Sequence, residues 1–74
     1  MEFRDRVVSD PAIMLGKPVI KGTRITVELI LRDLSDGMTM EELIRAYPQL
    51  RDEDIRAALS YSAAVVADEE VLAI

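Results

Sequence analysis

The sequence predicts a mainly α-helical fold, with a short N-terminal β-hairpin followed by a bundle of three helices. Two glycines and a proline surround the β-branched pair Val19-Ile20 within residues 15–25, a pattern typical of a hairpin. Three later segments repeat apolar residues at helical spacing, and capping or breaking residues separate them. A chain of 74 residues fits one domain. We divide it into a β-ribbon (1–25), a three-helix bundle (26–67) and a C-terminal tail (68–74).

The β-ribbon is expected to place cations on a rigid frame. Its hairpin is predicted to pair residues 12–15 with residues 17–20, with Gly16 near the bend. Residues 3–8 alternate weakly and predict a short edge strand. The cations of this region are Lys17, Lys21, Arg24 and Arg6. They are either scattered surface charges or a surface for phosphate or an acidic partner.

The first two helices have clear start and stop signals. Thr26 is a predicted N-cap, and Gly37 suits a left-handed C-terminal residue. Thr39 and Glu42 have the spacing of a capping box, and Pro48 ends the second helix. The predicted core faces are Val27, Ile30, Leu31 and Leu34 in the first helix and Met40, Leu43, Ile44 and Tyr47 in the second.

The third helix follows the second after a short break, and the two have helix-turn-helix proportions. Asp52 is its predicted cap. Its core face is predicted to be Ile55, Ala58, Leu59, Ser62, Ala63 and Val66, and a second stripe contains Ala57, Tyr61, Ala64 and Val65. In such motifs the start of the second helix reads bases. Here that start holds Arg51 and Arg56 but also three carboxylates, which phosphates would repel, so a helical hairpin with an acidic N-cap is the alternative.

The composition argues against catalysis and for binding. The chain lacks Cys and His, the residues that most often serve as thiolate nucleophile, general base or soft metal ligand. The glycine-rich run lacks the order of a phosphate-binding P-loop, and solvated helix ends explain the acidic clusters better than a metal does. We therefore expect no enzyme activity, no cofactor and no metal.

Charge and hydrophobicity suggest the kinds of partner. The net charge is −5 and is unevenly distributed. Residues 1–35 contain six Lys and Arg and five Asp and Glu, whereas residues 36–74 contain three Lys and Arg and nine Asp and Glu. This balance favours a basic protein partner over strong DNA binding by a monomer. Half of the residues are hydrophobic and three are aromatic, which favours a homodimer. Because we find neither a membrane-length apolar run nor a signal peptide, we expect a cytoplasmic protein.

The C-terminal tail has a character of its own. Acidic residues precede apolar ones there, in the order Asp68, Glu69, Glu70, Val71, Leu72 and Ile74. The tail is either a frayed end or an anchor for a protein partner.

Several motifs in order resemble the "domain of unknown function 433" family of VapB-like antitoxins. They are Asp10-Pro-x-Ile13, Gly16-Lys-Pro-Val-Ile-x-Gly-Thr-Arg-Ile25, Val27, Gly37-Met-Thr-x-Glu-Glu42, Tyr47-Pro48-x-Leu50 and Glu53-Asp-Ile55. The chain departs from the family pattern by having Lys21 where Arg is usual and Thr26 where Pro is usual.

This resemblance implies a homeodomain-like helix-turn-helix and an operon partner, often a PIN-like ribonuclease toxin. It implies that the chain is the antitoxin of a type II toxin-antitoxin system, which neutralises that toxin and binds its own operator in transcription regulation. We predict DNA contacts at Lys17, Lys21, Arg24, Arg51 and Arg56, and toxin contacts at the tail. The alternative function is a small dimeric protein-interaction module without DNA binding.

Overall fold

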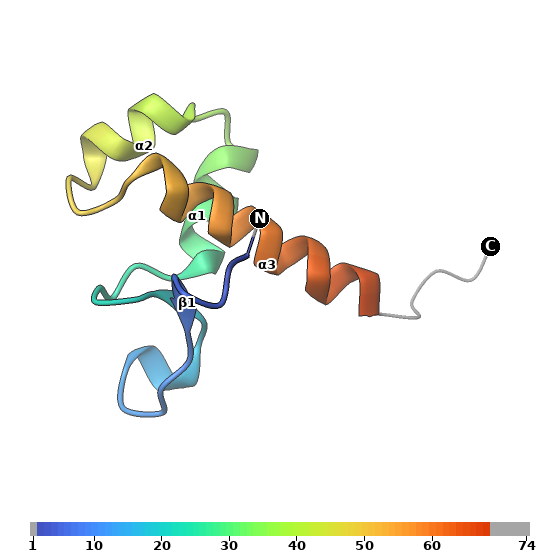
Figure 1. The fold of residues 1–74 in the computed structure, drawn as a ribbon. Coiled ribbons are helices and arrows are strands. Elements are labelled where there is room, and N and C mark those ends of the chain that lie inside the picture. The colour runs from blue at the N-terminus through green and yellow to red at the C-terminus, as the bar shows by residue number, and fades with distance from the viewer. Residues whose placement is uncertain (1, 69–74) are drawn as a thin grey trace.

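A computed structural model describes residues 2–68 as a small hairpin and three α-helices (Figure 1). The elements in order are β1 (Val7–Val8), the 3₁₀ turn η1 (Met14–Gly16), β2 (Val19–Ile20), α1 (Val27–Ser35), α2 (Met40–Ala46) and α3 (Asp52–Asp68). The first part of α3 lies among α1, α2 and β1, while its later part projects away from them (Figure 1). The predicted fold class is therefore confirmed.

The hairpin pairs different strands from those predicted. β1 and β2 are antiparallel, with Val7 opposite Ile20 and Val8 opposite Val19. The predicted pairing of residues 12–15 with residues 17–20 is wrong, because a local turn occupies the first of these segments. The carboxylate of Asp10 accepts from the Ala12 N–H at 2.9 Å, and Met14, Leu15 and Gly16 all have positive φ. A left-handed turn cannot form an extended strand.

The caps of α1 and α2 form as the sequence predicts. The hydroxyl of Thr26 accepts from the Leu29 N–H at 3.0 Å, and Gly37 has a φ of 102° after the end of α1. In the capping box of α2, the Thr39 hydroxyl accepts from the Glu42 N–H at 3.1 Å and the Glu42 carboxylate accepts from the Thr39 N–H at 2.8 Å. These bonds satisfy amides that the first turn of a helix would otherwise leave unpaired.

The start of α3 differs from the prediction. Asp52 is the first residue of the helix, and its carboxylate accepts from the side chain of Arg56 at 2.8 Å. The carboxylate of Asp54, one of the buried residues of α3, instead accepts from the Arg51 N–H at 2.9 Å. Asp54 lies three residues after Arg51 and reaches back to its N–H, as the third residue of a helix does in a capping box. The helix start is thus stabilised by Asp54, and the prediction of Asp52 as the cap is wrong.

The core gathers apolar residues from the hairpin and all three helices. Its fully buried large members are Ile20, Ile30, Leu43, Leu50, Ile55 and Val19. The predicted core face of α3 is only partly right: Ile55 and Ala58 are buried, whereas Leu59, Ala63 and Val66 are exposed. The exposed residues lie on the later part of α3, which projects beyond the other helices (Figure 1).

Replacing Gly22 by valine should destabilise the fold by about 1–3 kcal/mol through backbone strain. Gly22 has a φ of +79°, and no heavy atom lies within 4 Å of the position that a Cβ would take, so steric overlap adds nothing. Urea unfolding measures the loss. Gly22→Asn is the matched control and should lose less, because Asn tolerates left-handed φ. Equal stability of Gly22→Val and the unchanged chain would contradict this conformation.

Candidate functional site

An ion-pair network connects the base of the ribbon to α1. The ammonium of Lys17 lies 2.9 Å from one carboxylate oxygen of Glu28, and the guanidinium of Arg32 lies 3.0 Å from the other. The pKa of Glu28 is lowered, first by the hydrogen bond that Lys17 donates and then by the positive charges of Lys17 and Arg32. Lys17, one of the predicted DNA contacts, therefore already has an anionic partner within the domain.

A partly buried ion pair connects the N-terminal segment to α3. The guanidinium of Arg6 donates to the Asp54 carboxylate at 2.9 Å, and the Arg6 side chain is 34% exposed against 9% for that of Asp54. Arg6 is thus not a free surface cation. The sequence suggested that Asp54 faces solvent, but its side chain is buried. Only Asp52 and Glu53 of the three acidic residues at the start of α3 are exposed.

The Arg6–Asp54 pair links the backbone at Lys21 to the backbone at Arg51. The Lys21 N–H donates to the Arg6 carbonyl oxygen at 2.7 Å, and the Arg51 N–H donates to the Asp54 carboxylate at 2.9 Å. A chain of hydrogen bonds therefore joins Lys21 in the ribbon to Arg51 in the turn before α3. Within residues 2–68, the side chains of Lys21, Arg24 and Arg51 form no ion pair.

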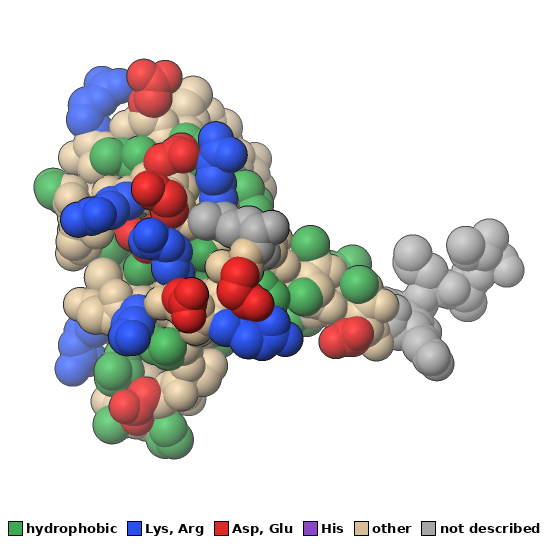
Figure 2. Space-filling view, viewed as in Figure 1, with side chains coloured by type: hydrophobic (Ala, Val, Ile, Leu, Met, Phe, Trp, Pro, Cys, Tyr) green, Lys and Arg blue, Asp and Glu red, His purple; other side chains and the backbone are tan. Residues whose placement is uncertain are grey.

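We call Lys21, Arg24 and Arg51 the cation cluster, because these three side chains share the lack of an ion-pair partner within residues 2–68. The chain of hydrogen bonds links the backbone of Lys21 to that of Arg51 and does not include Arg24. Of the two other predicted DNA contacts, Lys17 is paired with Glu28 and Arg56 is paired with Asp52 at 2.8 Å. Figure 2 shows Lys and Arg interspersed with Asp and Glu across the visible face. Sequence reasoning missed the link through Arg6 and Asp54, because these residues are 48 positions apart and no local spacing connects them.

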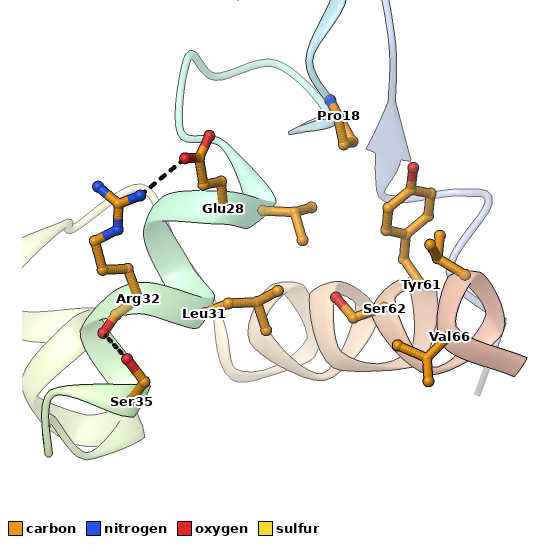
Figure 3. A pocket seen from close by; sticks show the side chains of 10 residues that line it. Pro18, Glu28, Leu31, Arg32, Ser35, Tyr61, Ser62 and Val66 are labelled. Atoms are coloured by element: carbon orange, nitrogen blue, oxygen red, sulfur yellow. Dashed lines mark hydrogen bonds and ion pairs between the residues drawn. The ribbon is translucent and has the colours of Figure 1, made fainter. Parts of the chain in front are cut away.

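An apolar groove of about 590 Å³ lies between α1 and the later part of α3 (Figure 3). Tyr61 forms part of one wall, and the Phe3 ring meets the Tyr61 ring edge-on, with 5.4 Å between their centroids. Such a contact holds an aromatic side chain in place. The groove is lined by Pro18, Val27, Glu28, Leu31, Arg32, Ser35, Tyr61, Ser62, Val65 and Val66. The groove could not be predicted from the sequence, because the apolar residues that line it also fit the pattern of a continuous helical core.

The predicted partner-binding tail is mostly outside the described residues. Asp68 is the last residue of α3 and is exposed. Glu69, Glu70, Val71, Leu72 and Ile74 lie beyond residue 68, so their predicted role stays a prediction. Within the described range, no helix is long and apolar enough to cross a bilayer, and no three potential metal ligands cluster.

The fold defines a small, mainly helical domain with a β-hairpin in front of its three helices. The chain belongs to the family described as "Protein of unknown function (DUF433)", whose model matches residues 7–62. It is similar in structure to a DUF433 member protein from Anabaena variabilis, with a TM-score of 0.81 and 28% identity. That match covers 86% of this chain and 63% of the other.

Two relatives in sequence carry no functional description in their names. The "Uncharacterized protein y4eO" of Sinorhizobium fredii is 38% identical over 61 residues, which are 82% of this chain and 28% of that protein. An "Uncharacterized protein" of Archaeoglobus fulgidus is 57% identical over 28 residues, 38% of this chain and 78% of that protein. This chain thus spans under a third of the Sinorhizobium relative.

Proposed function

We propose that this chain is the antitoxin of a type II toxin-antitoxin pair, which neutralises a PIN-like ribonuclease and binds operator DNA for autoregulation. The observation that supports the DNA-binding part is that Lys21, Arg24 and Arg51 have no ion-pair partner in the described part of the chain. The Arg6–Asp54 pair also ties the ribbon at Lys21 to the turn before α3 at Arg51. The toxin-binding part is supported by the family resemblance and by the acidic, then apolar, order of the tail.

Ion pairs within the domain reduce the repulsion that the acidic start of α3 would exert on DNA phosphates. Asp54 is paired with Arg6 and Asp52 with Arg56. Glu53 is the one acidic residue at the start of α3 without an ion pair in the described part of the chain. The repulsion that three free carboxylates would exert on phosphates is therefore reduced, and the cation cluster can approach the DNA backbone.

The cation cluster should account for most of the salt dependence of operator binding. Lys21→Ala and Arg24→Ala should each reduce the slope of log Kd against log salt by about one. Fluorescence anisotropy with the upstream DNA at several salt concentrations measures these slopes. Arg32→Ala is the charge-matched control, because Arg32 is already paired with Glu28, and it should leave the slope nearly unchanged.

Two results of this titration would redirect the proposal. If Arg56→Ala abolishes binding while Lys21→Ala, Arg24→Ala and Arg51→Ala bind normally, α3 is the DNA-reading element. If the unchanged chain fails to bind DNA at physiological salt, it is a protein-interaction module, which its net charge of −5 also favours.

Growth rescue tests the toxin-binding part in cells. The protein encoded by the neighbouring reading frame is induced alone and together with this chain. The proposal expects growth arrest in the first case and growth in the second. An adjacent protein that is harmless when expressed alone, or one whose arrest this chain does not relieve, would contradict the proposal.

A further inference from the structure

The apolar face of α3 continues beyond the point at which the bundle covers it. Ile55 and Ala58, on the earlier part of this face, are fully buried. Leu59, Ala63 and Val66 continue the face at spacing i, i+4 and i+7, and so form one ridge along the helix. All three are exposed, Leu59 to 42% and Val66 to 68%. Figure 2 shows hydrophobic side chains on this projecting part of the molecule.

The apolar groove lies beside this ridge, on the same part of α3. Leu31 of α1 faces Ser62 of α3 across it, and Val66 belongs both to the groove wall and to the ridge (Figure 3). Its volume of about 590 Å³ leaves room for several aliphatic side chains. The later part of α3 thus carries an apolar ridge and also borders an apolar groove. The groove has room for the ridge of another molecule.

The charge pattern indicates that the occupant is a second copy of this chain. The eleven residues 57–67 contain no Asp, Glu, Lys or Arg, although the whole chain has a net charge of −5. Two copies carry the same net charge and repel one another over long range, and contact through an uncharged surface adds no further repulsion. A basic partner would gain nothing from a surface without carboxylates. At the rim, Glu28 is already balanced by Lys17 and Arg32.

We propose that two copies associate about a two-fold axis, with their α3 helices antiparallel and the ridge of each copy seated at the groove of the other. Such an interface is self-complementary, as a two-fold dimer requires. This proposal does not rest on the proposed function, because the dimer would form whether or not it binds a toxin or DNA.

Sedimentation of the full chain and two charge variants tests the dimer. The unchanged chain should be dimeric at micromolar concentration, and Val66→Glu should raise the dimer dissociation constant by roughly 100-fold or more, because it places a carboxylate in the apolar contact. Leu15→Glu is the matched control: it adds the same charge at a 93% exposed apolar residue on the hairpin loop, and it should stay dimeric. A monomeric unchanged chain, or a Val66→Glu variant that dimerises normally, would overturn the proposal.

A cysteine cross-link tests the same face without disturbing its packing. Because the chain has no Cys, Ala63→Cys can form a disulfide only with another copy. Under mild oxidation it should give a covalent dimer in high yield, whereas Ala46→Cys, at an exposed alanine on α2, should not. Equal yields from the two variants would contradict the proposed face, even if Val66→Glu failed to fold.

Discussion

Replacing Asp54 by alanine should destabilise the fold by about 2–3 kcal/mol, because it removes a helix cap and leaves Arg6 without its partner. The Asp54 carboxylate accepts from the Arg6 guanidinium and from the Arg51 N–H, both at 2.9 Å, and its side chain is 9% exposed. The lower end of this range of destabilisation allows for the partial exposure of Arg6, because solvent weakens the ion pair. The melting temperature should fall by roughly 10–20 °C.

Asp52→Ala is the control for this prediction. It removes a carboxylate of the same helix turn, but from an exposed pair with Arg56 whose side chains are 50% and 64% exposed, so it should cost about 0–1 kcal/mol. Arg6→Ala alone and combined with Asp54→Ala completes a double-mutant cycle. Equal losses for Asp54→Ala and Asp52→Ala would show that the Arg6–Asp54 pair does not hold the ribbon against α3.

Removing residues 68–74 should abolish toxin neutralisation while the protein stays folded and dimeric. Asp68 is at the exposed end of α3 and forms no ion pair with the described residues, so its loss should leave the core intact. An electropositive ribonuclease cleft would attract the acidic residues and bury the apolar ones. Inhibition of the adjacent-frame protein by the truncated chain measures the effect, with circular dichroism as the folding control.

Two full-length variants separate the two roles within the tail. Neutralising the charges with Asp68→Asn, Glu69→Gln and Glu70→Gln should mainly slow association, with less salt dependence. Replacing Val71, Leu72 and Ile74 by serine should mainly speed dissociation. Full neutralisation by the truncated chain would exclude the tail and move the toxin site to the ribbon or the helices.

The sequence predicted those parts of the fold that depend on neighbouring residues. The caps at Thr26 and Thr39 and the left-handed Gly37 each require residues within a few positions, so their chemistry is visible in a short window. The observed strand Val7–Val8 lies within the edge strand predicted at residues 3–8, but its pairing with Val19–Ile20 was missed. These two segments are more than ten residues apart, and no local pattern shows that they pair. The expected strand at residues 12–15 does not form, because the turn that begins at Asp10 and continues through Gly16 occupies this segment.

The candidate site could be predicted only in part, because its connections are tertiary. Lys21, Arg24 and Arg51 were recognised as cations, but the Arg6–Asp54 pair that links the backbone at Lys21 to that at Arg51 spans 48 positions. The exposure of Val66 follows from the length of α3, 17 residues, against 9 for α1 and 7 for α2. Periodicity places a residue on a face of a helix, but it does not show where the neighbouring helices end.

Inhibition of RNA cleavage by purified components tests the antitoxin function most directly. The protein encoded by the adjacent reading frame is assayed on RNA while this chain is added in increasing amounts. We predict that the cleavage rate falls to background near a stoichiometric ratio and that the two proteins elute together in gel filtration. Unchanged RNA cleavage at a large excess of the folded chain, with separate elution of the two proteins, would contradict the proposed function.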